Sequence, residues 1–507
     1  MSEHEESGET QDQLFQQRLR KLEALRAQGN DPFVVERCDR SHTAAQVTDE
    51  AQFAAQENQT VSIAGRLVAR RNMGKAAFAH LADESGRIQI YVRLNDVGEA
   101  AYEQFKDLTD LGDFLCVQGF IFRTKTGEIS VHVQHLHIIS KAMRVPPFGK
   151  LDAEGQTHNA LADVEDRYRY RYLDLIANPE SRHRLTQRSR IVSSMRRFLD
   201  GKGFLEVETP VLQQEAGGAS ARPFQTHHNY LDHDFKLRIS LELFLKRLII
   251  GGFEKVYEIG RVFRNENMDR DHNPEFTLME LYQAYVNLED IMELVEEMYE
   301  AICTEVNGGP TFLWKDQTID LSARPWRRLP MLEGIQQYAG IDPADLSSLE
   351  TAHAACRAID APIDLSKEPT LGGLIEKLHE VYTQPHLVQP TFITDFPTET
   401  SPLAKKRPDD PSLTRRFEVY IGTAELGNAF SEINDPLDQR ERFIDQVAQS
   451  AAGDPEAHPM DEDFLRAMEF GMPPTGGLGI GIDRMVMLLT NSESIRDILL
   501  FPLMKPR

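Results

Sequence analysis

The chain has 507 residues, which is too long for one hydrophobic core and predicts about two to four domains. Its composition, with 41% hydrophobic and 8% aromatic residues, is typical of a soluble globular protein. No apolar run approaches the roughly 18 residues of a membrane span, and the acidic start 1–17 lacks a signal-peptide core. We therefore expect a cytoplasmic protein with no membrane partner.

Charge is distributed unevenly along the chain. The formal net charge of −24 disfavours a polyanionic partner, because like charges repel. However, residues 61–150 carry 12 basic and 9 acidic side chains, and residues 167–197 carry 9 arginines and 2 acids. These basic islands are compatible with binding of tRNA or another polyanion, although arginine-rich helices also form intramolecular ion pairs.

The four cysteines, Cys38, Cys116, Cys303 and Cys356, lie far apart and form no C-x-x-C pair. This spacing argues against a disulfide framework and against a cysteine zinc site. We expect them to pack in hydrophobic cores.

The first 142 residues predict a helical extension, 1–58, followed by a small β-domain, 59–142. In the extension, the first dozen residues are expected to be disordered and a helix is expected over 14–28. The β-domain has five short alternating segments, with a helical segment, 97–108, between the third and fourth. The five segments are 61–65, 77–81, 87–92, 114–119 and 129–133. This order predicts a five-stranded barrel of the oligonucleotide-binding (OB) type, and any other small β-domain is the alternative.

Residues 143–181, which include Pro146-Pro147, are predicted to be a linker. Residues 182–507 mix long helices with strands, so we expect an α+β domain there.

Two arginines in that domain, Arg264 and Arg484, each end an apolar stretch. A buried guanidinium needs an anionic partner to offset its desolvation, and a polyphosphate meets that need. The fold must bring the two together across 220 residues if they share one site.

A β-hairpin is predicted over 256–285. Alternation with a period of two places one set of side chains on a single face of each strand. These sets are Val256, Glu258, Val262 and Arg264, and Phe276, Leu278, Glu280 and Tyr282. If the two faces align, the hairpin can hold an α-phosphate, stack a purine and orient an amine. The alternative is a half-buried hairpin with one internal Arg–Glu pair.

Residues 417–432 place three acids and an amide around Gly422 and Gly427. Glu418 and Glu425 could bind Mg²⁺, which leaves Asn428 and Glu432 for a substrate. The alternative is that Glu425, Asn428 and Glu432, spaced three and four apart, line the polar face of a helix, although each glycine would cost a helix about 1 kcal/mol.

A glycine-rich run, 476–484, forms the third candidate segment. Glycines in a strand permit close approach of a ligand, and Asp483 is expected to cap the following helix. The run lacks the Lys-Ser/Thr ending of a P-loop, which disfavours a Walker-type ATPase.

Together these segments resemble the three signature motifs of class II aminoacyl-tRNA synthetases: 203–210 is similar to motif 1, 263–276 to motif 2 and 479–484 to motif 3. The resemblance runs from about residue 15 to the C-terminus. The barrel indicates the subgroup that charges lysine, aspartate or asparagine. The resemblance implies an anticodon-binding OB-fold, followed by a catalytic domain with an antiparallel sheet flanked by helices. It also implies a homodimer formed through motif 1.

The pocket residues are similar to those of the lysine-charging branch, the lysyl-tRNA synthetases. Residues 240–246 are Ser-Leu-Glu-Leu-Phe-Leu-Lys, whereas an aspartate or asparagine enzyme would show Ser-Pro-Gln-Leu-x-Lys-Gln. An ε-ammonium group needs a carboxylate and a hydroxyl, which Glu432 and Tyr282 can provide. The resemblance thus implies a ligase that activates L-lysine with ATP and transfers it to the 3′ end of tRNA(Lys).

The resemblance assigns the ATP site first. Arg264 and Arg484, the catalytic pair, would hold the α- and γ-phosphates, and Phe276 would stack on adenine. Glu418 and Glu425 would bind Mg²⁺. Further ATP contacts are assigned to Glu266, His272, Asn273, Glu418 and Gly481.

For lysine, the resemblance assigns the α-amino group to the Gly218 carbonyl and Glu242, and the carboxylate to Arg264 and Asn428. The lysine side chain would meet Glu432 and Tyr282, and Glu280 completes the set. Glu242 has an alternative interpretation as a surface i,i+4 pair with Lys246. Ala429 stands where the family usually has glycine, and its methyl group would narrow the pocket.

In the barrel, Phe78, Gln89 and Glu128 fall where the subgroup reads a central anticodon uridine. Phe78 would stack on the base, Gln89 would hydrogen-bond to it and Glu128 would accept a hydrogen bond. Taken singly, each is more often a packing or solvated residue.

Two other functions remain open. A related enzyme that lysylates a protein would lack the barrel. A synthetase-like RNA-binding or regulatory protein would have no need of Arg264, Glu418, Glu425 and Arg484.

Overall fold

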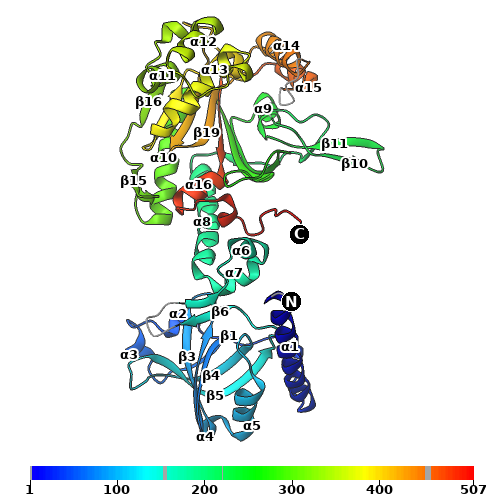
Figure 1. The fold of residues 1–507 in the computed structure, drawn as a ribbon, viewed down its shortest axis with the longest axis vertical. Helices are drawn as coiled ribbons and strands as arrows, with labels where there is room; N and C mark the ends of the chain where they lie inside the picture. The colour runs from blue at the N-terminus through cyan, green and yellow to red at the C-terminus, as the bar shows by residue number, and fades with distance from the viewer. Residues whose placement is uncertain (1–2, 152–156, 220, 452–457, 507) are drawn as a thin grey trace. The chain divides into compact units, whose positions relative to one another are not determined.

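The computed structural model describes residues 3–151, 157–219, 221–451 and 458–506, and the chain forms two compact units, Met1–Pro179 and Glu180–Arg507 (Figure 1). Among these described residues, no helix combines the length and apolar character needed to cross a bilayer.

The first unit contains a closed five-stranded barrel with the strand order β1-β2-β3-β5-β4. Its strands are β1 (Thr60–Met73), β2 (Ala76–Ala82), β3 (Arg87–Arg93), β4 (Phe114–Arg123) and β5 (Ile129–Ser140). Each of the five predicted segments lies within one of them, and the OB-fold prediction is confirmed. The helix expected between the third and fourth strands is interrupted at Gly98, whose φ of 84° does not fit a helix. It forms α4 (Leu94–Val97), α5 (Glu99–Glu103) and a π-helical turn, Gln104–Leu108.

The N-terminal extension packs on the barrel through α1 (Glu3–Ala27). The helix begins well before the predicted start at Leu14, so the described backbone from Glu3 does not follow the expected disorder. Leu25 is buried in the barrel core, and Lys21 Nζ lies 2.6 Å from Asp110. The rest of the extension forms a 3₁₀ turn (Pro32–Val34), α2 (Ala44–Val47) and α3 (Phe53–Gln56).

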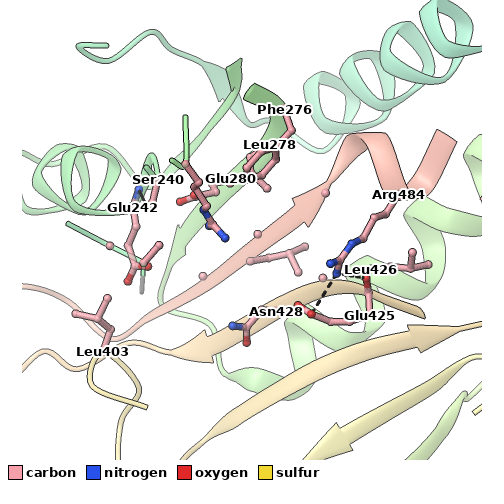
Figure 2. A pocket seen from close by; sticks show the side chains of 18 of the residues that line it. Ser240, Glu242, Phe276, Leu278, Glu280, Leu403, Glu425, Leu426, Asn428 and Arg484 are labelled. Carbon is pink, nitrogen blue, oxygen red and sulfur yellow. Dashed lines mark hydrogen bonds and ion pairs between the residues drawn. The ribbon is translucent and has the colours of Figure 1, made fainter. Parts of the chain in front are cut away.

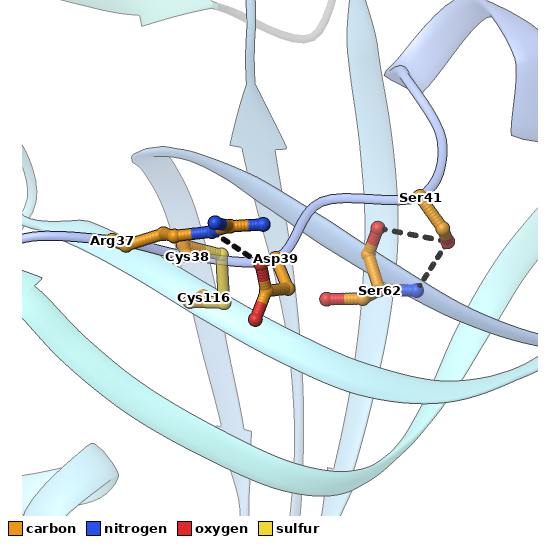
Figure 3. Close-up of a disulfide and its surroundings, with 6 residues drawn as sticks. All are labelled: Arg37, Cys38, Asp39, Ser41, Ser62 and Cys116. Carbon is orange, nitrogen blue, oxygen red and sulfur yellow. Dashed lines mark hydrogen bonds and ion pairs between the residues drawn. A yellow bond between two sulfur atoms is a disulfide. The ribbon is translucent and has the colours of Figure 1, made fainter.

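A disulfide joins the extension to the barrel, which contradicts the expectation for two of the four cysteines. Cys38 precedes α2 and Cys116 lies on β4, and their sulfur atoms are bonded (Figure 3). Backbone and side-chain hydrogen bonds between Ser41 and Ser62 hold the same segment along β1. Spacing in the sequence missed the pair because its members are 78 residues apart and meet only when the extension folds back on the barrel. Cys303 and Cys356 are buried in hydrophobic clusters, as expected.

The predicted linker contains regular structure: the hairpin β6 (Phe148–Leu151) and β7 (Thr157–Ala160), then α6 (Val164–Arg169) and α7 (Arg171–Ala177). The basic island 167–197 forms many ion pairs within the chain, for example between Arg171 and Asp174 at 2.8 Å and between Arg196 and Glu206 at 2.9 Å. These pairs favour the intramolecular interpretation of that island.

The second unit is built on an eight-stranded sheet with the order β16-β17-β18-β19-β20-β13-β12-β8. The central pairs are antiparallel, as predicted, whereas the pair at each edge, β16–β17 and β12–β8, is parallel. The strands are β8 (Leu205–Glu206), β12 (Lys255–Phe263), β13 (Glu275–Ala284), β16 (Arg327–Pro330), β17 (Thr391–Thr394), β18 (Arg416–Ile421), β19 (Ala424–Ser431) and β20 (Thr475–Gly481).

Helices cover this sheet on both faces. On one face, α8 (Pro179–Gly201), α10 (Leu288–Asn307) and α16 (Ile482–Leu489) bury the largest core, which includes Met279 and Leu281 of β13. On the other face, α9 (Glu242–Ile250) packs against the side chains of β12 and β13 that alternate with these. Beside β16 and β17 lie α11 (Met331–Ala339), α12 (Leu349–Ala358) and α13 (Leu371–Leu378) (Figure 1).

The remaining elements lie around the sheet. A small sheet of β9 (Leu212–Gln213), β10 (Gln225–His228) and β11 (His233–Leu237) carries a projecting hairpin (Figure 1). The others are β14 (Thr311–Trp314), β15 (Gln317–Asp320), α14 (Pro436–Ala451), α15 (Glu462–Met468) and α17 (Ile495–Ile498).

Candidate active site

Strand direction explains how Arg264 and Arg484 meet. Both β12 and β20 are antiparallel to β13, which lies between them, so β12 and β20 run in the same direction. Arg264 follows the last residue of β12, and Arg484 lies three residues beyond the end of β20, in α16. The two arginines therefore stand at the same end of the sheet, on either side of the first residues of β13.

The hairpin of β12 and β13 has the predicted register. Glu258 pairs with Glu280 and Val262 with Phe276, so the predicted residues of both strands share one face. Glu258 is held by Arg238, whose Nη1 lies 2.6 Å from Oε1. The alternative, a hairpin with a single internal Arg–Glu pair, explains Glu258 but not Glu280, whose side chain lines the cavity.

A cavity of about 430 Å³ opens on this face. It is lined by every residue predicted to contact ATP, Mg²⁺ or lysine except Glu418. These are Gly218, Glu242, Arg264, Glu266, His272, Asn273, Phe276, Glu280, Tyr282, Glu425, Asn428, Glu432, Gly481 and Arg484. Figure 2 shows Glu242 and Arg484 toward opposite ends of the cavity, so the cavity has two chemically different ends.

The end near Arg484 is cationic. The Arg264 guanidinium carbon lies 5.1 Å from the centre of the Phe276 ring, and its Nε is 3.4 Å from the Ile239 carbonyl. Burial lowers the pKa of Arg264, and the nearby carboxylates of Glu266, Glu280 and Glu425 oppose this shift. Arg484 donates from Nη1 to Glu425 and lies 3.4 Å from His272 Nε2. Two guanidinium groups beside an aromatic face suit an anionic ligand with a planar ring.

Glu418 and Glu425 lie on a strand hairpin, so the helix given as an alternative for Glu425, Asn428 and Glu432 does not form. The turn is Gly422-Thr423, and both residues have positive φ, as a two-residue hairpin turn requires. Glu418 is buried just outside the cavity, where it accepts hydrogen bonds from Arg416 at 2.6 Å and Tyr420 at 2.7 Å. Burial and the neighbouring Glu425 raise the pKa of Glu418 to about 7.

The end of the cavity near Glu242 is anionic. Glu242, Glu280 and Glu432 are all buried, and Tyr282 donates a hydrogen bond to Glu280 at 3.3 Å. Burial raises the pKa of Glu280 to about 7 and that of Glu432 to about 8, and the charge of Glu242 adds to both shifts. Glu432 Oε2 forms an ion pair with Lys246, whereas Oε1 accepts no hydrogen bond from the described residues. Buried carboxylates with unused acceptor capacity suit a ligand with ammonium groups.

The Glu242–Lys246 pair given as an alternative is present, but it is not on the surface. Lys246 Nζ lies 2.5 Å from Glu242 Oε1, and Lys246 is fully buried. The same ammonium reaches Glu432 from the other side.

Backbone without side chains forms part of the cavity wall. A Cβ on Gly477 would lie 2.0 Å from Glu432 Oε1 and 2.6 Å from the Tyr282 ring. Gly218 has a φ of 87°, and a Cβ there would lie 2.4 Å from Ser240 Oγ. Glycine at 477 thus leaves room for the Glu432 carboxylate and the Tyr282 ring, and glycine at 218 leaves room for the Ser240 hydroxyl group.

Two expectations near the motifs are wrong. Asp483 does not cap α16, because the helix begins one residue earlier, at Ile482 after Gly481. Its carboxylate instead accepts hydrogen bonds from Arg188 and from the Thr277 backbone. Ala429 does not narrow the pocket: it is fully buried in the main core, because it alternates with Asn428, which faces the cavity.

The three predicted barrel residues lie together on the outside of the barrel. Phe78 pairs across the strands with Tyr91, with ring centres 4.8 Å apart. Gln89 Nε2 donates to Glu128 Oε2 at 2.6 Å, and Glu128 also contacts His80. The arrangement presents an aromatic face beside an amide and a carboxylate, which suits an unstacked base.

Comparison with known proteins agrees with this geometry. Residues 163–505 match the family described as tRNA synthetases class II (D, K and N), and residues 61–139 match the OB-fold nucleic acid binding domain. The chain belongs to the class II tRNA synthetases of the D, K and N group.

Similar proteins cover nearly the whole of this synthetase. The lysine–tRNA ligase of Pelotomaculum thermopropionicum is 52% identical over 505 residues, which make up 99% of this chain and 97% of that protein. The lysine–tRNA ligase of Roseiflexus castenholzii is 51% identical, with 98% and 99% covered. That of Enterococcus faecalis is 49% identical, with 96% of each covered.

The sequence interpretation of this synthetase missed Arg416. Its guanidinium binds Glu418, donates to Asn428 Oδ1 at 3.2 Å and lies 4.1 Å from the Phe396 ring. It therefore fixes the carbonyl oxygen of Asn428 and leaves the amide nitrogen for a ligand. Alternation along β18 would have revealed it, because Arg416 and Glu418 point to the same face.

Proposed function

We propose that the chain is a lysine–tRNA ligase. The observation that carries the proposal is the buried Glu432, whose Oε1 has no hydrogen-bond donor in the described chain. It lies beside Tyr282 in the same cavity as Arg264. The full-length similarity to lysine–tRNA ligases supports the same substrate. An ammonium group entering this end would supply both the missing donor and a positive charge, and neither an aspartate nor an asparagine side chain carries an ammonium group.

The proposed reaction has two steps. The lysine carboxylate attacks the α-phosphorus of ATP, and pyrophosphate leaves from the opposite side. The terminal ribose hydroxyl of tRNA(Lys) then attacks the activated carbonyl, and AMP leaves. We assign no side chain as a covalent nucleophile, so the rate enhancement comes from positioning and from charge stabilisation by Arg264 and Arg484.

Each end of the cavity has its own task in this proposal. Arg264 holds the α-phosphate and the attacking carboxylate, Arg484 holds the γ-phosphate, and Phe276 stacks on adenine. Glu266, His272, Asn273 and Gly481 complete the ATP site. Gly218 and Glu242 bind the α-amino group, Asn428 binds the carboxylate, and Glu280, Glu432 and Tyr282 surround the ε-ammonium group.

Mg²⁺ is proposed to accompany ATP. Glu418 and Glu425 fit it, because both are oxygen donors and the charge of Glu425 helps to raise the pKa of Glu418 although Arg416 is paired with Glu418. No cluster of three or more potential ligands was found among the described residues, so ATP phosphates would complete the coordination. When bound, Mg²⁺ would neutralise phosphate charge.

The partners follow from the two units. Phe78, Gln89 and Glu128 are proposed to read a base of the tRNA(Lys) anticodon. We also propose a homodimer through motif 1, because Leu205 and Leu212 near that motif are about half exposed, at 49% and 47%. We place the enzyme in the cytoplasm with its tRNA substrate.

Amino-acid-dependent exchange between ATP and pyrophosphate tests the function. We expect exchange with lysine and none above background with aspartate or asparagine. Faster exchange with aspartate than with lysine would overturn the substrate assignment. Charging of tRNA(Lys) in the same preparation separates a tRNA ligase from an enzyme that lysylates a protein, and the absence of any exchange would favour a non-catalytic protein.

A further inference from the structure

One buried cation sits among the residues proposed to bind lysine. Lys246, one helical turn after Glu242 on α9, is fully buried. Its Nζ lies 2.5 Å from Glu242 Oε1, forms an ion pair with Glu432 Oε2 and is 5.9 Å from the centre of the Tyr282 ring. Three elements of the fold, α9, β13 and β19 with its C-terminal extension, therefore converge on a single ammonium group.

Lys246 lies behind the cavity wall and not in the cavity. Its partners Glu242, Glu432 and Tyr282 line the cavity, whereas Lys246 does not. The two oxygens of Glu432 lie on opposite sides of the cavity wall. Oε2 pairs with Lys246, and Oε1 lies over Gly477 beside Tyr282 without a hydrogen-bond donor from the described chain. A ligand can therefore bind Glu432 without displacing Lys246.

Charge explains why a cation is needed there. Glu242, Glu280 and Glu432 would place three negative charges around one end of the cavity, and buried like charges suppress one another's ionisation. Although burial opposes its charge, the two carboxylates raise the pKa of Lys246, so the cation persists. When all three carboxylates are ionised, Lys246 offsets one of their three negative charges, and two remain for the two ammonium groups of lysine.

We propose that Lys246 is a positioning residue that sets the separation of Glu242 and Glu432, and thereby selects an amino acid whose two ammonium groups span that separation. This inference rests on the proposed function. The neighbouring His458 is also buried at this end of the cavity. It adds no positive charge between Glu242 and Glu432, because burial and Lys246 lower its pKa to about 4.

The test compares Lys246→Met, which removes the charge and keeps the length, with Lys246→Arg, which keeps the charge. Lys367→Met, at an exposed lysine, is the matched control. Exchange between ATP and pyrophosphate is measured with lysine and with ornithine, which is one methylene shorter, and KM is determined for lysine and ATP separately.

For Lys246→Met we expect the KM for lysine to rise by about tenfold or more and the preference for lysine over ornithine to fall by at least about fivefold. The KM for ATP should stay within about twofold of the wild type, and Lys246→Arg should recover part of the preference. An unchanged lysine KM and an unchanged preference would overturn the proposal, as would a parallel rise of both KM values.

If Lys246→Met does not fold, Lys246→Gln, which retains a donor but no charge, is held to the same criteria. Failure of the wild type to exchange with lysine would instead refute the proposed function, so the two failures are distinguishable.

Discussion

Arg484 Nη1 lies 2.9 Å from the backbone carbonyl of Glu425 and 3.2 Å from Oε2 of the same residue. The hydrogen bond to the backbone carbonyl fixes the guanidinium group to β19. The hydrogen bond to the carboxylate can be replaced by one to a ligand (Figure 2). The arginine is therefore positioned before a phosphate arrives, and positioned charges stabilise a transition state without reorganisation.

Arg264→Ala is expected to lower lysine-dependent exchange by about 100-fold or more, because one guanidinium is proposed to contact both reacting groups. Arg261→Ala provides the matched control, since Arg261 is an exposed residue of the same strand, β12. Thermal unfolding should differ by only a few degrees between the two variants. Equal exchange rates in both would remove Arg264 from the proposed machinery.

Gly477→Ala is expected to abolish lysine-dependent exchange, because the added methyl group would lie 2.0 Å from Glu432 Oε1. Gly479→Ala is the comparison on the same strand: there the nearest atom, Glu280 Cγ, is 3.6 Å away, an ordinary contact. Calorimetry should show that Gly477→Ala still binds ATP. If Gly479→Ala were the more damaging substitution, the proposed position of the ε-ammonium group would be wrong.

Lysine binding is expected to release protons near neutral pH. The pKa of Glu280 is raised to about 7 and that of Glu432 to about 8, so both are partly protonated in the empty protein. An ammonium ligand favours the ionised form, lowers both pKa values and expels protons between about pH 6 and pH 8. Binding enthalpies measured in buffers of different ionisation enthalpy give the number released. The Glu432→Gln variant should release fewer protons than the wild type. Release of an equal number would show that the protons come from another group.

Phe78→Ala is expected to lower kcat/KM for charging of tRNA(Lys) by about 10- to 100-fold, because one base would lose the aromatic ring on which it stacks. Lysine-dependent exchange, which needs no tRNA, should be unchanged. Gln118→Ala, on the exposed side of β4, controls for general damage to the barrel. A loss of exchange that parallels the loss of charging would argue against a role in reading the anticodon.

Local periodicity was sufficient for much of the site. Side chains alternate along a strand, so the faces of β12 and β13 could be derived from the sequence, and the observed pairing of Val262 with Phe276 agrees with them. The barrel strands were found for the same reason. The family motifs then placed Glu425 and Asn428, which face the same cavity from β19.

The features of the site that could not be predicted from the sequence are those that depend on long-range contacts. An i,i+4 pair of Glu242 and Lys246 appears the same in a sequence whether it is exposed or buried, and its burial depends on Glu432, which comes much later in the chain. The Cys38–Cys116 bond depends in the same way on the extension folding back on the barrel. Asp483 was misassigned because its partners, Arg188 and Thr277, belong to other elements.

The register of β20 limits how the selectivity of this site can be changed. Gly477 lies opposite Tyr282, and Gly479 lies opposite Glu280. A Cβ at Gly477 would lie 2.0 Å from Glu432 Oε1, whereas a Cβ at Gly479 would make only an ordinary contact with Glu280, so Gly479 is the position on this strand that can accept a side chain. Beyond Gly479, redesign for a shorter or uncharged substrate would have to proceed through α9, β13 and the end of β19, and each of those supplies a carboxylate that Lys246 or Arg264 already balances.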